Sequence, residues 1–217
     1  MVVADLARMP DIKHALAKAA YAAGVRQVVD ISSRLASLPW RSSYIGHAHR
    51  LGEERVLGIA GRGSFVAIRP SRFMISQLWL DLPGIKKSDT IFTTQDGDKD
   101  FEWISTDDIA DVVTHVLTEP VEKHGDAVYE LTGDNVSERA RAALFSKALG
   151  RPVTFKQISP KVQYDQIVEH AKMPHLMAFD LVSSDSSKPP TTAVPVLLGR
   201  PYETLESWIS KNKAAFQ

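Results

Sequence analysis

The order of apolar and polar residues changes repeatedly between two periods, which predicts strands alternating with helices. Residues 25–31 hold a β-branched run that is typical of a strand buried on both faces of a parallel sheet. The segment before it carries apolar residues at helical spacing and ends at Gly24: Ile12, Ala15, Leu16, Ala19 and Ala20. With a short strand expected at Val2 and Val3, these segments predict a strand–helix–strand unit.

The same alternation continues down the chain. A second helix is expected over residues 49–59, followed by the strand "SFVAIRP" at 64–70. Pro70 cannot donate to a sheet ladder and therefore marks the end of that strand, which leaves "SRFM" in a loop. Further strands are expected in "AVYELTG" and "RPVTFKQIS", with the helix "ERARAALFSKALG" between them. The pattern predicts an α/β fold built on a parallel sheet.

A helix start stands out in "FEWISTDDIADVVTHVLTEP". Ser105 or Thr106 is expected to cap this helix, and Asp107 and Asp108 suit its positive N-terminal end. Because acidic side chains are common in a first helical turn, we interpret the two aspartates as helix-start residues and not as catalytic ones.

Composition excludes several classes of function. Lys and Arg together number 26, as do Asp and Glu, so no net charge draws the chain to nucleic acid or to an anionic membrane. The absence of cysteine excludes disulfides, thiolate catalysis and zinc–thiolate sites. Without a signal peptide or a membrane-spanning apolar run, the sequence predicts a soluble cytoplasmic protein.

Several segments, taken together and in this order, resemble the NmrA-like atypical short-chain dehydrogenase/reductases: "AAGVRQVVDISS", "RLGEERVLGIAGRGSFVAIRPSRFM", "WISTDDIADVVTHVLTEP", "VYELTG", "SKALGRPVTFKQISP" and "LLGRPYETLESWISKNKAAF". The resemblance implies a Rossmann-like NAD(P)-binding core over residues 1–133. It also implies a small C-terminal subdomain over 134–217 that covers the substrate. Activities in the family range from quinone and imine reduction to redox sensing without catalysis.

The chain departs from the family at its start. Family members begin with a strand and a GxxGxxG loop that binds the cofactor's pyrophosphate, whereas "VVAD" here matches the fourth strand of the family's sheet. The expectation is an N-terminally truncated sheet whose exposed edge favours self-association through Val2 and Val3, or else a rearranged N-terminus. The glycines in "GIAGRG" at 58–63 precede a strand instead of following one, which argues against a replacement phosphate loop.

By resemblance, the nicotinamide end of NADP or NAD and the substrate lie against loop residues after two strands: Ser32, Ser33, Pro70, Ser71, Arg72 and Phe73. Such loops lie at the carboxyl edge of a parallel sheet, where ligands bind. An ordinary loop role is the open alternative for each of them.

Two residues are candidates for proton transfer. Tyr44 is a candidate acid, although the YxxxK spacing of standard short-chain dehydrogenases places Ala48 where the lysine belongs. His49 matches a histidine common in the family, and its near-neutral pKa suits proton transfer. His47 and His49 lack the further ligands of a metal site. Glu53 and Glu54 are interpreted as a solvated helix face, with Glu53 one turn from His49 and able to orient it.

Two classes of function follow. The first is an NAD(P)H-dependent oxidoreductase of the NmrA-like kind that reduces a quinone, imine or enone. The second is a descendant that needs no cofactor: an isomerase, cyclase or lyase using His49 or Tyr44, or a regulatory binding protein.

Overall fold

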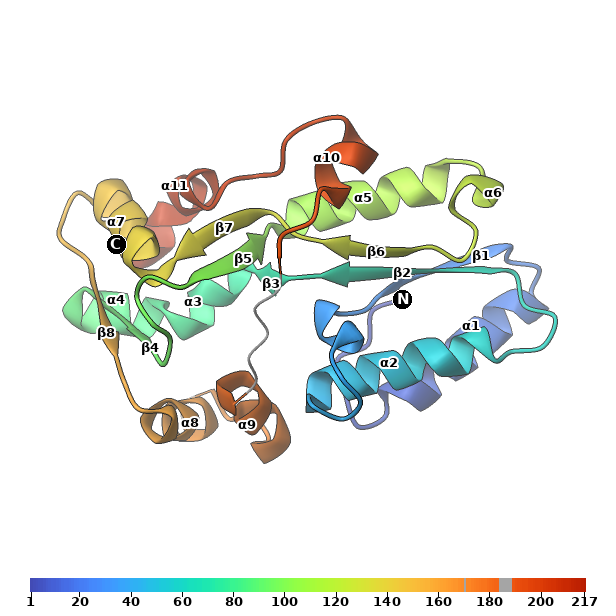
Figure 1. Ribbon diagram of the computed structural model, residues 1–217, viewed down its shortest axis with the longest axis horizontal. Coiled ribbons are helices and arrows are strands. Elements are labelled where there is room, and N and C mark those ends of the chain that lie inside the picture. Colours follow the sequence, from blue (N-terminus) through green and yellow to red (C-terminus); the bar gives the residue numbers. More distant parts are fainter. Residues whose placement is uncertain (170, 184–188) are drawn as a thin grey trace. The chain divides into compact units, whose positions relative to one another are not determined.

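The computed structural model describes residues 1–169, 171–183 and 189–217 (Figure 1). The chain forms two compact units that alternate along the sequence. Unit 1 comprises Met1–Ser71, Asp107–Leu131 and Thr191–Pro201, and unit 2 comprises Arg72–Thr106, Thr132–Pro190 and Tyr202–Gln217. The sequence predicts a single domain boundary, after residue 133. In the structure the chain passes between the two units five times, and the passage nearest to the predicted boundary follows Leu131.

Unit 1 is built on a parallel three-stranded sheet in the order β1-β2-β6. Its strands are β1 (Gln27–Ile31), β2 (Ser64–Pro70) and β6 (Val128–Leu131). Helices α1 (Met9–Ala22) and α2 (Tyr44–Leu57) lie on one side of the sheet and α5 (Thr106–Thr118) on the other (Figure 1). Shorter helical segments complete the unit: η1 (Arg34–Ser37), α6 (Val121–His124) and α10 (Ala193–Leu198). The expected parallel α/β architecture is therefore confirmed.

The buried face of α1 differs from the predicted one. Its buried residues are Met9, Pro10, Lys13 and Ala17, whereas Leu16 is 51% exposed. The apolar stripe was wrong because it skipped Lys13, a charged residue that the structure buries completely. Unit 1's core also includes Val28, Val56, Phe65 and Ala67.

The strand predicted at Val2 and Val3 is not formed. Only Met1 bonds to the edge of β1, with the Ile31 amide donating to its carbonyl oxygen at 2.9 Å, and Val2 is 80% exposed. The chain leaves the edge because it turns into α1, which begins at Met9 with a proline in its first turn. Self-association through Val2 and Val3 stays a prediction.

Unit 2 holds two further sheets. Strands β3 (Arg72–Phe73), β5 (Asp100–Ile104) and β7 (Asp134–Ser137) form one, in which β5 and β7 are antiparallel, and β4 (Thr90–Thr93) pairs with β8 (Thr154–Gln157) in the other. The "SRFM" segment therefore contributes a short strand where a loop was expected.

The helical segments of unit 2 are η2 (Met74–Ser76), α3 (Gln77–Leu80), α4 (Leu82–Ser88), α7 (Glu138–Leu149), α8 (Pro160–Glu169), α9 (His175–Ser183) and α11 (Leu205–Phe216). In the described ranges, the longest of them are α7 and α11. The two long helices, α7 and α11, meet in the unit's core, where the Phe145 and Phe216 rings lie edge to face at 4.8 Å. The predicted helix over 138–150 and strand within 151–159 are confirmed.

Helix α5 begins where the sequence predicts. Asp107 and Asp108 lie in its first turn, which confirms their helix-start role. Asp108 is also buried and pairs with Arg200 at 2.8 Å. The aspartate therefore joins the C-terminal segment of unit 1 to this helix as well.

The glycine cluster at 58–63 is explained by the turn between α2 and β2. Gly61 has a φ of +68°, and a Cβ on Gly63 would lie 2.3 Å from the Arg26 carbonyl oxygen. Arg62 is engaged by Asp126 through two hydrogen bonds of 2.7 and 2.6 Å. The glycines at 61 and 63 therefore serve the backbone geometry of this turn.

We expect Gly63→Ala to lower the free energy of unfolding by about 1–3 kcal/mol, because backbone atoms must move to admit the methyl group. Gly58→Ala in the same cluster is the control: the added methyl carbon would lie 3.4 Å from the nearest backbone oxygen, and the change should stay within about 0.5 kcal/mol. Urea denaturation of both variants measures the difference, and equal effects would contradict this packing.

None of the helices in the described ranges combines the length and the apolar character that crossing a bilayer requires.

Candidate functional site

Residues after β1 extend that strand's contacts at the carboxyl edge of unit 1's sheet. Ser32 is buried, and its amide donates to the Ile68 carbonyl oxygen at 2.7 Å. Its hydroxyl donates to the carboxylate of Glu53 on α2. Ser33 accepts from the Leu35 amide at 3.2 Å and so caps η1. The structure therefore places both serines beside the strand end, each with a structural partner.

The end of β2 offers a different arrangement. Pro70 is buried, and the Ser71 amide donates to the Leu131 carbonyl oxygen at 2.9 Å. The Ser71 hydroxyl oxygen is buried and has no hydrogen-bond partner in the described part of the chain. Because buried hydroxyls are normally paired, this oxygen fits a ligand's polar group.

Arg72 and Phe73 begin unit 2 and form β3. The Arg72 guanidinium lies over the rings of Phe101, at 4.6 Å from the ring centre, and Trp103, at 5.1 Å. Burial lowers the pKa of Arg72 from its usual range. Phe73 is 38% exposed. Arg72 thus packs against aromatic rings. Its contact with the cofactor stays a prediction.

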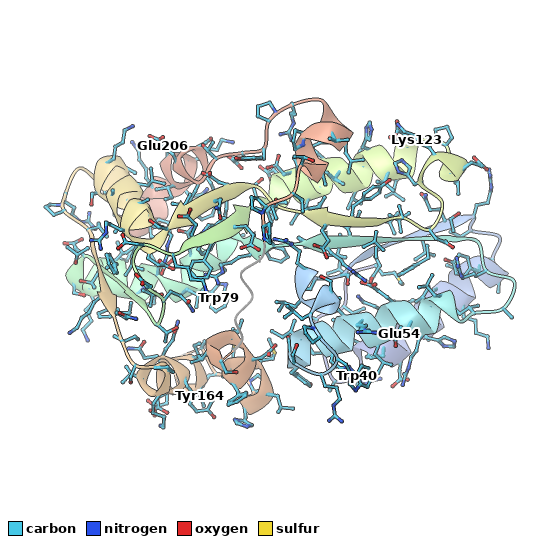
Figure 2. All side chains as sticks on the ribbon, viewed as in Figure 1. Trp40, Glu54, Trp79, Lys123, Tyr164 and Glu206 are labelled. Carbon is cyan, nitrogen blue, oxygen red and sulfur yellow. The ribbon has the colours of Figure 1, made fainter. Side chains whose placement is uncertain are left out.

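Glu53 and Glu54, predicted alike as solvated, differ in the structure. Glu54 lies on α2 with its side chain exposed (Figure 2) and pairs with Arg50 at 2.9 Å. Glu53 is only 4% exposed and accepts from Ser32 and from Arg69, the latter at 3.0 Å. The solvated interpretation of Glu53 was wrong because the sheet-facing side of α2 includes this position.

A buried ion pair supports His49. Lys13 on α1 and Asp30 on β1 are both fully buried, and the Lys13 ammonium lies 2.7 Å from Asp30 Oδ2. The ammonium also contacts the Ile31 carbonyl oxygen at 3.3 Å and His49 Nδ1 at 3.4 Å. Sequence analysis did not identify either charged residue as part of the site.

This environment changes the chemistry of His49. Burial, assisted by the positive charges of Lys13 and Arg69, lowers the pKa of His49 from 6.5 to about 3. The near-neutral pKa expected from residue type is corrected accordingly: the imidazole stays uncharged through the physiological range. A neutral imidazole can donate a hydrogen bond through its one N–H group and accept one at its other nitrogen, but it lacks the readily released second proton of an imidazolium acid.

The lowered pKa predicts a pH dependence of stability. Between about pH 3 and 6.5 the unfolded chain binds a proton at His49 that the folded chain does not, so this residue's contribution rises with pH. We expect the difference in unfolding free energy between the unmodified protein and His49→Gln to rise by up to about 1.4 kcal/mol per pH unit in that window and to level off above it. Denaturant titrations at several pH values measure it, and a constant difference would contradict the lowered pKa.

The other aromatic candidates lie nearby on α2. Tyr44 is the helix's first residue and is half-buried, and its hydroxyl forms no hydrogen bond within the described residues. His47 lies edge to face with Trp40, at 4.7 Å between ring centres. Trp40, labelled in Figure 2, is 61% exposed by its accessible surface. The role of Tyr44 as an acid stays a prediction.

A signal for the missed residues exists in the sequence. Asp30 interrupts an otherwise apolar strand, and Lys13 is four residues from both Met9 and Ala17, on the helix face that the structure buries. Two opposite charges on buried faces of consecutive elements indicate a pair. In the described ranges, no group of three or more potential ligands among His, Cys, Asp and Glu could hold a metal ion.

The chain is similar in sequence to a known protein family and to a characterised reductase. The model of the NmrA-like family matches residues 79–213, which is more than half of the chain. A curated relative from Streptomyces griseus subsp. griseus, a "(4-alkanoyl-5-oxo-2,5-dihydrofuran-3-yl)methyl phosphate reductase", is 28% identical over 208 residues, covering 93% of this chain and 71% of the relative.

Two solved structures show the same fold. The NADPH-dependent quinone oxidoreductase QOR2 from Escherichia coli, in complex with NADPH, has a TM-score of 0.80 at 20% identity, with 97% of this chain and 74% of that one covered. The triphenylmethane reductase of Citrobacter sp., in complex with NADP(H), has a TM-score of 0.78 at 18% identity and the same coverage.

Proposed function

The chain belongs to the NmrA-like family, and on this premise we propose that it is an NAD(P)H-dependent reductase of a small conjugated carbonyl compound. The proposal narrows the quinone, imine or enone range expected from sequence to substrates in which a C=C bond is conjugated with a carbonyl group.

The observation that carries the proposal is the match to the Streptomyces griseus reductase over 93% of the chain. The name of its substrate specifies a 2,5-dihydrofuran ring with a 5-oxo and a 4-alkanoyl group, so the ring's C=C bond is conjugated with two carbonyls. The solved structures with NADPH and NADP(H) support a nicotinamide cofactor for this fold.

The residues at the carboxyl edge of unit 1's sheet fit the nicotinamide end of such a cofactor. The Ser71 hydroxyl is buried and has no hydrogen-bond partner in the described chain. It could therefore form a hydrogen bond with the carboxamide of the nicotinamide ring. Pro70 and Ser32 are buried at the two strand ends and would line the site. The bound cofactor would supply a hydride, and the family resemblance supports a substrate-covering role for residues 134–217.

The proposed chemistry assigns His49 a definite task. Hydride addition to the carbon β to a carbonyl places negative charge on the carbonyl oxygen. A hydrogen bond from a neutral imidazole stabilises that charge without transferring a proton. Water then protonates the α carbon, which completes the reduction and leaves His49 unchanged.

The test uses NADPH carrying deuterium at both C4 positions and a panel of a 4-acyl-dihydrofuran-5-one, a cyclic enone and a naphthoquinone. We expect a saturated tetrahydrofuranone product that carries one deuterium at the β carbon, together with one NADP⁺ per product, as measured by mass spectrometry. His49→Gln should lower kcat/KM by about 10²-fold, through loss of one hydrogen bond to the developing charge, while His14→Gln should leave it unchanged.

Consumption of substrate without deuterium transfer would contradict the proposal. That outcome would favour the second class expected from sequence, a redox-neutral isomerase, cyclase or lyase. Binding of a small molecule without turnover would favour the regulatory alternative.

A further inference from the structure

Lys13 is a buried cation whose every donor has an acceptor. Its side chain is fully buried, and its three N–H groups match three acceptors: Asp30 Oδ2 at 2.7 Å, the Ile31 carbonyl oxygen at 3.3 Å and His49 Nδ1 at 3.4 Å. Burying an ammonium is costly unless it is paired and hydrogen-bonded, so this complete set of partners is a specific arrangement.

The contact with Lys13 determines the tautomer of His49. An ammonium can only donate, so Nδ1 of the imidazole must accept, and the ring's single proton is then on Nε2. In the described residues Nε2 has no hydrogen-bond partner, and the ring is partly exposed. The Nε2–H group is therefore available to a ligand.

We propose that Lys13 is a positioning residue that holds His49 as the neutral Nε2–H tautomer, so that Nε2–H donates a hydrogen bond to the carbonyl oxygen of the substrate. This inference rests on the proposed function for the identity of the ligand oxygen. The tautomer itself depends only on residues of unit 1.

The charges around His49 come from each element packed against it. Lys13 on α1 and Arg69 on β2 act on His49 directly, while Asp30 on β1 and the Met1 amino group face Lys13. Glu53 on α2 pairs with Arg69. Glu53 is occupied by Ser32 and Arg69, so the role predicted for it, orienting His49, passes to Lys13. Two cations next to the ring oppose its protonation, in agreement with the lowered pKa of His49.

This arrangement suits an electrophilic role. A histidine that titrates near neutrality would switch between a cation and a neutral ring as the pH changes, whereas His49 keeps one donor in one place. Developing negative charge on a carbonyl oxygen is stabilised best by donors that need no reorganisation during the reaction.

The experiment is ¹⁵N–¹H correlation NMR of the histidine rings of the full chain, with His49 assigned by the signal lost in His49→Gln. We expect the unmodified protein to show the Nε2–H tautomer at a constant shift from about pH 4.5 to 8. The variant Lys13→Met/Asp30→Asn removes both charges of the pair together, which avoids leaving one buried and unpaired. In it, His49 should exchange tautomers and titrate at a higher pH than in the unmodified protein, because the charge of Lys13 no longer opposes protonation of the ring while burial still does.

Lys18→Met, at an exposed position of the same helix, is the control and should leave the His49 signal unchanged. The inference is overturned if His49 titrates near pH 6.5 in the unmodified protein, if its proton is on Nδ1, or if the double variant keeps the original tautomer and pKa. The spectrum of the unmodified protein decides the first two points even where the double variant does not fold.

These measurements need neither cofactor nor substrate, so they separate this inference from the proposed function. If the protein does not reduce any member of the panel but shows the expected tautomer, the proposed function fails and Lys13 keeps its role in positioning His49. If turnover is observed, kcat/KM should be flat from about pH 5 to 8 in the unmodified protein and should fall at the acid end of this range in the double variant.

Discussion

Replacing Arg141 with methionine is expected to lower the free energy of unfolding by about 3–5 kcal/mol. Arg141 on α7 is 4% exposed and pairs with two carboxylates, Asp81 and Glu138, which are each 2% exposed. Without the guanidinium, both carboxylates remain buried with no ion-pair partner at contact distance, and the more distant charge of Arg72 offsets them only in part. The loss should be smaller at about pH 4 than at pH 7, because burial raises the pKa of the Asp81 carboxyl and protonation at acid pH then removes its uncompensated charge.

Arg139→Met is the matched control, two residues away on the same helix. Arg139 pairs with Asp98 at 2.9 Å, but both side chains are mostly exposed, so this change should cost far less stability than the loss of Arg141. Denaturant titration of both variants at the two pH values measures the contrast. Equal losses, or a loss for Arg141→Met that does not depend on pH, would show that packing and not charge governs the site.

Replacing Glu53 with alanine should lower the free energy of unfolding by about 3 kcal/mol. The Glu53 carboxylate joins three elements of unit 1, since it is on α2 and accepts from Ser32 after β1 and from Arg69 on β2. Its removal leaves the Arg69 guanidinium, whose side chain is 16% exposed, without its main partner. Thermal and urea unfolding measure the loss.

Glu54→Ala provides the control for this variant, because the neighbouring carboxylate pairs with Arg50 at an exposed position. That change should stay within about 0.5 kcal/mol. If the two glutamates proved equally tolerant, the buried network beneath the predicted nicotinamide site would not have the importance that we assign to it.

The sequence predicted the order of elements well because its long apolar runs have a single interpretation. The β-branched runs around Val28 and in "SFVAIRP" became β1 and β2, and the period in "IADVVTHVL" became α5. Boundaries that depend on capping were harder to place: α2 begins five residues before the expected position because Ser43 accepts from the Gly46 amide at 2.9 Å. The two-residue strand β3 depends on pairing with β5, which no local pattern shows.

The site was only partly predictable for a physical reason. Ser32, Ser71 and His49 follow from the rule that ligands bind at the carboxyl ends of parallel strands and from family resemblance. The burial of Lys13 and Glu53 could not be predicted in this way, because a charged residue on a helix is expected to face solvent unless a buried partner is known. The partners of both lie on other elements. The charge of Lys13 adds to burial in lowering the pKa of His49.

Whether this chain binds a nicotinamide cofactor is tested most simply by titrating the purified protein with NADPH and with NADH while following the fluorescence of the bound nicotinamide. We expect saturable binding with a Kd in the micromolar range for at least one of the two cofactors. Replacing Ser71 with valine removes the unpaired hydroxyl and should weaken this binding. Absence of binding up to millimolar concentrations of both cofactors would contradict the claim that this chain is a nicotinamide-dependent reductase.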